Sequence, residues 1–234
     1  MTRLETIKQI TQQLMMTPSA LSSANAWLWD RTQRIVRNVE TISQLPEIAE
    51  ANIAVDRFCL HAAAYFADSG FTNYITTEHL EPALVLADIN TTDLREFSTQ
   101  IVSEHLSSVI EQSRIDKINK IILESNNRFC EMTEAMILSD ARNLDDIGIV
   151  GLFNDFCACG VHTKGVTDAL QSWKKKVDYR YWQARLKEGF RFESVRNIAS
   201  ARFEQAERFM HQLAIENSTK DVEEIKIEQL TQGI

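Results

Sequence analysis

Charged and amide side chains occur in three stretches of the sequence whose pattern is otherwise that of apolar helices. Arg31, Arg34 and Asn38 follow one another at spacings of three and four, which places them on one face of a helix. A second stretch is an apolar run that ends in Asp68, and a third includes Asp140. Carboxylates can coordinate a divalent cation, and arginines bind phosphate or carboxylate groups through paired hydrogen bonds. The sequence therefore offers two chemistries, a metal centre and an anion site.

The order of these stretches resembles the HD-domain superfamily of metal-dependent phosphohydrolases, which are all-helical proteins, over roughly residues 26–215. In that family an early helix carries a His followed three residues later by an Arg and an aliphatic residue. Arg34 and Ile35 match, but the His is replaced by Arg31. The His-Asp doublet that names the family aligns with Ala67 and Asp68, so this second His is also replaced.

The family's last metal ligand comes from an Asp-Ala-Asp-x-Leu-Asp-x-x-Gly pattern. Residues 139–148, SDARNLDDIG, follow this pattern closely, and the resemblance implies that Asp140 is the ligand. Some members add a His at the end of an isoleucine-rich helix, where this chain has Asn126 and its neighbours. That His is absent as well.

The substitutions change what the site can hold. Asp68 and Asp140 alone form an open oxygen site, which seldom retains Mg²⁺ or Mn²⁺ without further ligands. The Arg31 guanidinium is permanently charged, repels a cation and pairs with carboxylates. We therefore expect Arg31 to lie between Asp68 and Asp140, in place of the ion. This predicts a degenerate HD-domain protein, weak or inactive as a phosphohydrolase and without a cofactor, which binds an anionic, nucleotide-like ligand or a protein partner.

Three alternatives remain open at this point. The chain could be an active phosphohydrolase that holds Mn, Fe, Ni or Mg through catalytic Asp68 and Asp140, with Asp30 or Asn126 as a substitute ligand. It could be a structural helical scaffold with a filled pocket. The helix register could also turn Arg31 to solvent and Asp30 inward. If an anion is bound, the predicted ligand-binding residues are Arg31, Arg34, Asn38 and Asn126.

The helices that must position these residues follow from apolar residues at helical spacing. The segment 71–91, which includes His79, mixes apolar and polar residues without a clear period. It is predicted to be a loop with a short helix beside the pocket. Residues 1–25 are predicted to be an N-terminal helical extension, 26–215 the HD-like helical domain and 216–234 a charged C-terminal tail. Helices are predicted near residues 2–15, 26–44, 47–68, 93–111, 114–125, 133–146, 149–159, 167–187 and 192–215.

Composition supports an all-α, single-domain bundle. The chain has 234 residues, 44% of them hydrophobic, and only seven glycines and three prolines to punctuate turns between strands. A net charge of −8 argues against general nucleic-acid binding. The apolar runs are too short for a membrane span or a secretory signal, so we expect a cytoplasmic protein with no membrane partner. The four scattered cysteines are expected to be free thiols, and an oligomer is possible.

Overall fold

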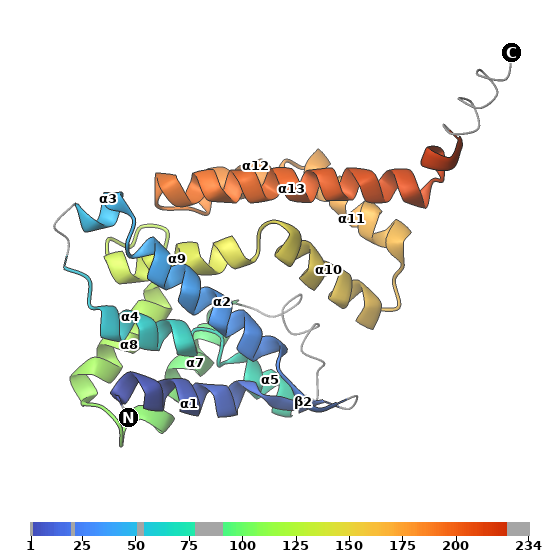
Figure 1. Ribbon diagram of the computed structural model, residues 1–234. Coiled ribbons are helices and arrows are strands. Elements are labelled where there is room, and N and C mark those ends of the chain that lie inside the picture. The colour runs from blue at the N-terminus through green and yellow to red at the C-terminus, as the bar shows by residue number, and fades with distance from the viewer. Residues whose placement is uncertain (1, 20–21, 51–53, 78–90, 224–234) are drawn as a thin grey trace, which may run out of the picture.

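The computed structural model describes residues 2–19, 22–50, 54–77 and 91–223. These residues are almost entirely helical, as predicted, and the figures keep the helix labels used here (Figure 1). The helices are α1 (Arg3–Met15), α2 (Trp27–Ile42), α3 (Pro46–Ala49), α4 (Arg57–Phe66), α5 (Phe71–Thr77), α7 (Thr91–Leu106), α8 (Gln112–Glu124), α9 (Thr133–Asp145), α10 (Ile149–Val161), α11 (Val166–Asp178), α12 (Tyr181–Glu188) and α13 (Glu193–Asn217).

The main core lies where α2, α4, α8 and α9 pack against one another, with α1 and α7 on the outside. Each helix turns one apolar stripe inward, because residues three and four apart share a face. Ile35 and Val39 of α2, Phe66 of α4 and Leu138 of α9 are fully buried in this core. Most of the helices contribute to this core, and the prediction of a single all-α domain is confirmed.

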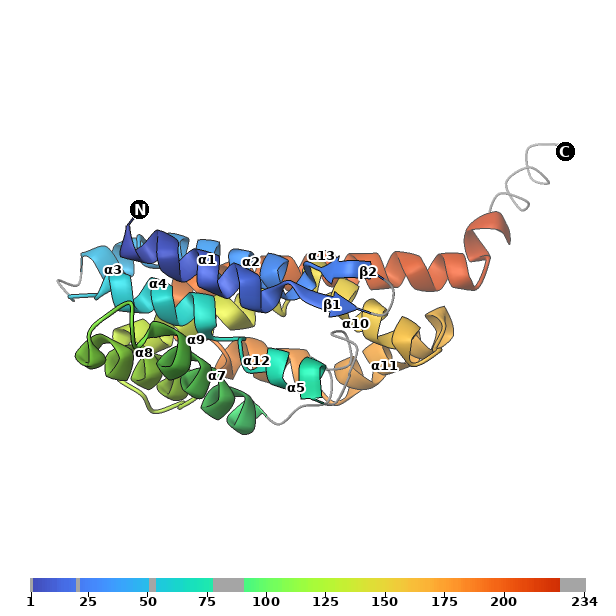
Figure 2. The same cartoon turned by 90° about the horizontal axis from the view of Figure 1, so that it is seen from below.

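The C-terminal half forms a second layer over this core. Figure 1 shows α13 running above α9 and α10, and Figure 2 shows the same arrangement from below. Helix α13 packs on α10, α11 and α12, with a small apolar cluster of Leu152, Ala206 and Met210. This layer places α10, α11 and α12 beside the ends of α2 and α9, where the charged residues lie.

The structure corrects several predicted elements. The helix predicted at 47–68 is two helices, α3 and α4, and the side chain of Asp56 starts the second by accepting a hydrogen bond from the Cys59 amide. The helix predicted at 167–187 is also two, because Arg180 adopts a left-handed conformation (φ 54°) between α11 and α12. Residues 71–77 are the helix α5, while His79 lies outside the described residues.

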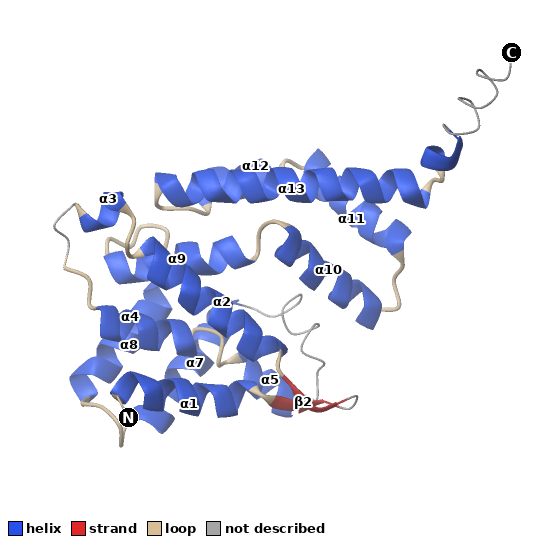
Figure 3. Cartoon of the chain, viewed as in Figure 1, coloured by secondary structure: helices blue, strands red, loops and turns tan. Residues whose placement is uncertain are grey.

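A short hairpin interrupts the helical pattern near the N-terminus, and it was not predicted (Figure 3). Strands β1 (Thr17–Ser19) and β2 (Ser22–Asn25) are antiparallel, with Thr17 opposite Asn25. This segment is rich in Ser, Thr and Asn, which compete with helical hydrogen bonds and favour turns. Among the described helices, none combines the length and apolar character needed to span a membrane.

Candidate functional site

Arg31 is the centre of a buried cluster of ionic groups. Its Nε donates to Oδ2 of Asp68 at 2.9 Å, and its Nη1 donates to Asp145 at 2.9 Å and to Asp146 at 2.7 Å. The side chains of Arg31, Asp68 and Asp145 are 3%, 1% and 2% exposed, whereas that of Asp146 is 35% exposed. One guanidinium therefore bridges three carboxylates from two other parts of the chain.

Helix packing brings these groups together. Arg31 lies on the face of α2 that packs against both α4 and α9. Asp68 follows the end of α4, and Asp145 and Asp146 end α9. The turn after Asp68 lies close to α7, because the amide of Gly70 donates to the Ser98 hydroxyl at 2.9 Å and a Cβ at Gly70 would collide with the backbone of α7.

Each carboxylate has a second arginine besides Arg31. Asp68 accepts from Nη2 of Arg142 at 2.7 Å, and Asp145 accepts from Nε of Arg34 at 2.6 Å. Asp146 accepts from Nη2 of Arg185 at 3.1 Å. We call these seven residues the arginine–aspartate cluster: Arg31, Arg34, Arg142, Arg185, Asp68, Asp145 and Asp146.

Neighbouring charges oppose the effect of burial on the pKa values of Asp68, Asp146 and Arg31. Burial by itself would raise the pKa of Asp68, but Arg142 and Arg31 hold it below its ordinary value. The pKa of Asp146 is lowered in the same way by Arg31 and Arg185, against the effect of burial. Burial would lower the pKa of Arg31, and the nearby carboxylates raise it instead. Four arginines face three aspartates, so the cluster carries one positive charge in excess.

The expected partner on α9 is corrected by the structure. Arg31 pairs with Asp68 as expected, but its other partners are Asp145 and Asp146 rather than Asp140. Asp140 faces the other way, where both its oxygens accept hydrogen bonds from the backbone amides of Arg191 and Phe192 at 2.9–3.0 Å. It therefore ties the loop before α13 to α9, and its pKa is raised to about 6 because burial outweighs these hydrogen bonds.

Arg142 is a site residue that the sequence analysis missed. It stands at the second Asp of the Asp-Ala-Asp pattern, so the family pattern and this chain differ there in sign of charge. This reversal could have been noticed in the sequence, because a guanidinium in place of a carboxylate binds anions where the carboxylate would bind a cation. Arg185 was also missed, since α12 carries no motif that points to α9.

The residues present do not fit a metal ion. Both oxygens of Asp68 are engaged by arginines, and both oxygens of Asp140 are engaged by backbone amides. In the described part of the chain, no three His, Cys, Asp or Glu side chains are placed to share a metal ion. A divalent cation added to a cluster that already has an excess positive charge would be repelled.

Beside the arginine–aspartate cluster lies a cavity of about 400 Å³, here called the Arg142 cavity. Helices α2, α9, α10, α11 and α12 contribute to its walls. Tyr181 is half-exposed on its wall, and Nζ of Lys176 lies 6.0 Å from the Tyr181 ring centroid. Among the described residues, the lining charges are four cations, Arg31, Arg142, Lys176 and Arg185, and two carboxylates, Asp146 and Asp155.

The predicted ligand-binding residues do not share one groove. Arg31 lines the Arg142 cavity, whereas Arg34 and Asn38 line a second cavity between α2 and α13. Asn126 is exposed at the rim of a third cavity. Asp30 is exposed to solvent, so the register that turns it inward is wrong. Spacing along α2 placed Arg31 and Arg34 on one face, but the turn at Asp145 and Asp146 separates the spaces they border.

Comparisons with known proteins find similarity in structure only. No protein-family model matches the sequence, and no curated protein matches it. A crystal structure of Bacillus subtilis YpgQ in complex with ADP is similar, with a TM-score of 0.59 and 19% identity over 90% of this chain and 93% of that one. The Lin1889 protein from Listeria innocua is similar with a TM-score of 0.55 and 20% identity, over 94% and 98% of the two chains. These similarities show the fold.

Proposed function

We propose that this chain is a cytoplasmic, degenerate HD-domain protein, inactive as a metal-dependent phosphohydrolase, that binds a nucleotide-like anion in the Arg142 cavity. One observation carries the proposal. Arg31, which aligns with a histidine of the HD-family pattern, bridges Asp68, Asp145 and Asp146 with its guanidinium. A site that supplies its own positive charge no longer needs a cation to bind phosphate groups.

Charge supports an anionic ligand. Among the described residues that line the Arg142 cavity, four side chains are cationic and two are anionic. Arg31 and Arg142 also pair with Asp68 and Asp145 behind the wall, and Lys176 pairs with Asp155, so the cluster and the lining together carry one positive charge in excess. Burial of unbalanced charge is costly, and an anion in the cavity would balance this excess. An acidic protein with net charge −8 that keeps such a concentration of arginine uses it locally rather than for general nucleic-acid binding.

Hydrogen-bond donors in the Arg142 cavity are also available. In the described structure, Nη2 of Arg142 donates a hydrogen bond to Asp68, whereas its buried Nε has no partner. The indole Nε1 of Trp182, a residue of the cavity wall, likewise has none. Unmatched buried donors are uncommon in folded proteins, and a bound oxyanion would match them.

The similar structure of YpgQ was determined in complex with ADP. ADP combines a diphosphate with an aromatic base, and the Arg142 cavity places arginines near the half-exposed ring of Tyr181. A purely structural scaffold would fill this space with side chains, whereas a cavity of about 400 Å³ remains. The same chemistry therefore favours a nucleoside diphosphate as the first ligand to test.

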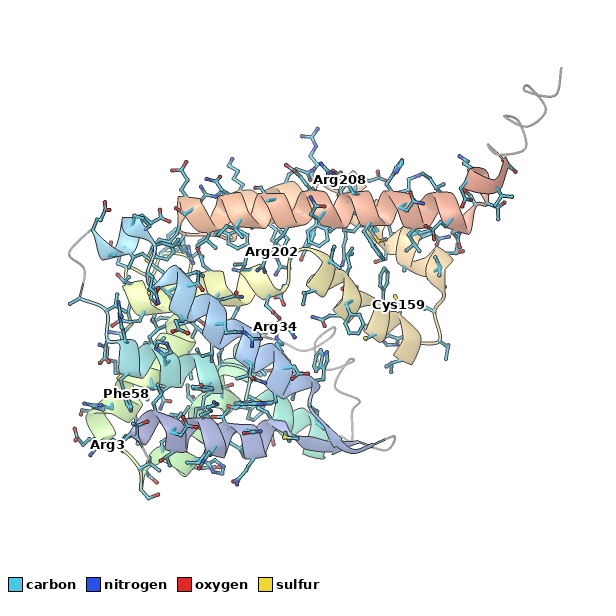
Figure 4. All side chains as sticks on the ribbon, viewed as in Figure 1. Arg3, Arg34, Phe58, Cys159, Arg202 and Arg208 are labelled. Carbon is cyan, nitrogen blue, oxygen red and sulfur yellow. The ribbon has the colours of Figure 1, made fainter. Side chains whose placement is uncertain are left out.

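Isothermal titration calorimetry with ADP in the presence of EDTA tests the proposal. Wild-type protein should bind ADP without metal, and Arg142→Gln should weaken binding at least about tenfold, because a charged hydrogen bond is worth about 1.5–3 kcal/mol. Arg208→Gln is the matched control, because Arg208 is exposed on α13 away from the cavities and loses the same charge (Figure 4). ADP binding that requires added Mn²⁺, or hydrolysis of ADP, would contradict the proposal.

A further inference from the structure

A second cavity, here called the Arg202 cavity, lies between α2, the turn from α9 to α10 and α13. Its volume is about 440 Å³. Figure 4 shows Arg34 on α2 and Arg202 on α13 in the space between these helices. Arg37, Asn38 and Gln205 add to the polar part of the wall, and no described residue lines both this cavity and the Arg142 cavity.

Positive charge dominates the Arg202 cavity. Three arginines line it, while Asp145 is its one carboxylate in the described structure. Asp145 is already shared by Arg31 and Arg34, at 2.9 Å and 2.6 Å. Arg37 and Arg202 form no ion pair with any described residue; Nη1 of Arg202 donates to the carbonyl of Leu144 at 2.6 Å. Two guanidinium groups therefore face this cavity without a carboxylate of their own.

The surroundings of Arg202 and the start of α10 add to the positive potential. Burial lowers the pKa of Arg202 more than the nearby Asp145 raises it, which is what a cation short of negative neighbours experiences. Ile149 and Val150 line the cavity from the first turn of α10, where the helix dipole places partial positive charge. These two aliphatic side chains are 52% and 38% exposed.

We infer that the Arg202 cavity is a second anion site, which binds a phosphomonoester. Its phosphate dianion is held by Arg37, Arg202 and Arg34, and its organic part lies against Ile149 and Val150. Two excess positive charges match a dianion, and paired guanidinium groups match the geometry of phosphate oxygens. The aliphatic rim favours a phosphomonoester over free inorganic phosphate, because only the ester has apolar surface to bury there.

The test is calorimetry at low ionic strength with phenyl phosphate and, in a second arm, inorganic phosphate. Phenyl phosphate should bind more tightly than inorganic phosphate. Arg37→Gln should weaken it about tenfold, and Gln205→Glu, an exposed change that adds a negative charge to the wall, should weaken it by a similar factor. Both variants should fold normally because neither side chain has a hydrogen bond within the described structure. Arg208→Gln should change binding less than about twofold.

Failure here is distinguishable from failure of the proposed function. Phenyl phosphate should still bind to Arg142→Gln, and ADP should still bind to Arg37→Gln. Phenyl phosphate that is lost in Arg142→Gln and unchanged in Arg37→Gln would overturn the second site, since the phosphate would then occupy the Arg142 cavity. Equal losses in Arg37→Gln and Arg208→Gln would also overturn it, because they would indicate attraction by overall charge alone. Absence of any binding would do the same.

Discussion

The Nε of Arg31 lies 2.9 Å from Oδ2 of Asp68, and the two side chains are 3% and 1% exposed. A buried pair of this kind is costly to break from one side, because the remaining charge stays in a medium where water cannot solvate it. Asp68 keeps Arg142 when Arg31 is lost, and Asp145 and Asp146 keep Arg34 and Arg185. The arginine–aspartate cluster therefore has some redundancy built in.

Arg31→Met should lower the free energy of unfolding by about 3 kcal/mol, at the low end of the cost of breaking a buried pair, because each carboxylate retains one arginine. Urea denaturation at pH 7 measures this. Arg34→Met is the matched control; its side chain is 29% exposed, so about 1 kcal/mol is expected. A loss for Arg31→Met no larger than that for Arg34→Met would show that Arg31 is not the centre of the cluster.

Restoring a metal site tests whether the HD-family resemblance has the right register. The triple change Arg31→His, Ala67→His and Arg142→Asp replaces two arginines by imidazole and carboxylate ligands. The cluster then has two negative charges in excess, which a divalent cation balances. The purified variant should retain near-stoichiometric Mn²⁺ or Ni²⁺ after dialysis, by elemental analysis, whereas wild type should retain none.

Thermal unfolding gives a second measure of the same restored site. Mn²⁺ at about 100 times its dissociation constant should stabilise the triple variant by about 2.7 kcal/mol. The single change Arg142→Asp is the control, since it supplies charge without imidazoles. A triple variant that folds by circular dichroism yet binds no metal would mean that Arg31 and Ala67 do not occupy the positions of the family's two histidines.

The sequence predicted the helices well, because the apolar period of 3.6 residues depends only on local order. Leu4, Ile7 and Leu14 mark α1, and Ile35, Val39 and Ile42 mark α2. It could not predict the breaks in two long helical patterns, since a break such as the left-handed Arg180 depends on what packs on either side. The cores of elements were therefore more predictable than their ends.

The site was predictable only in part. Arg31 and Asp68 could be paired from charge and motif order. The partner on α9 could not, because Asp140, Asp145 and Asp146 stand at different angles around the helix end, at about 100° per residue. Asp140 meets the amides of Arg191 and Phe192, which precede α13, whereas Asp145 and Asp146 meet Arg31.

The pKa values of Asp140 and Asp68 are shifted in opposite directions, so the two carboxyl groups should affect stability in different ranges of pH. The pKa of Asp140 is raised to about 6 by burial, so the stability linked to its protonated form is present below its unfolded pKa near 4 and is lost as the pH rises through about 6. The pKa of Asp68 is lowered by Arg142 and Arg31. The contribution of this carboxylate to stability is therefore present above its unfolded pKa and is lost as the pH falls through the lowered pKa of the folded state.

Carbon-13 NMR of the side-chain carboxyls from pH 3 to pH 8 measures both groups in one sample. The Asp140 resonance should move with a midpoint near pH 6, and the Asp68 resonance should stay at its ionised position down to the lowest pH at which the protein remains folded. Asp140→Asn and Asp68→Asn assign the two signals. An Asp140 midpoint at or below that of a model aspartate would contradict the description of its buried setting.

Two glycines at the ends of α10 should respond to alanine with opposite signs. Gly148, just before the helix, has φ +91°, and a Cβ there would lie 2.9 Å from Cβ of Arg202. Gly148→Ala should therefore destabilise the protein by about 1–3 kcal/mol, because an L side chain is strained at this φ and also pushes on α13.

Gly160 lies within α10, and a Cβ there meets nothing within 4 Å. Gly160→Ala should stabilise the protein by about 0.5–1 kcal/mol, since alanine loses less backbone entropy in a helix. Urea denaturation of both variants, with unchanged dependence on urea concentration, separates these effects. Equal changes in the two would contradict the positive φ of Gly148 and the close approach of Arg202 to it.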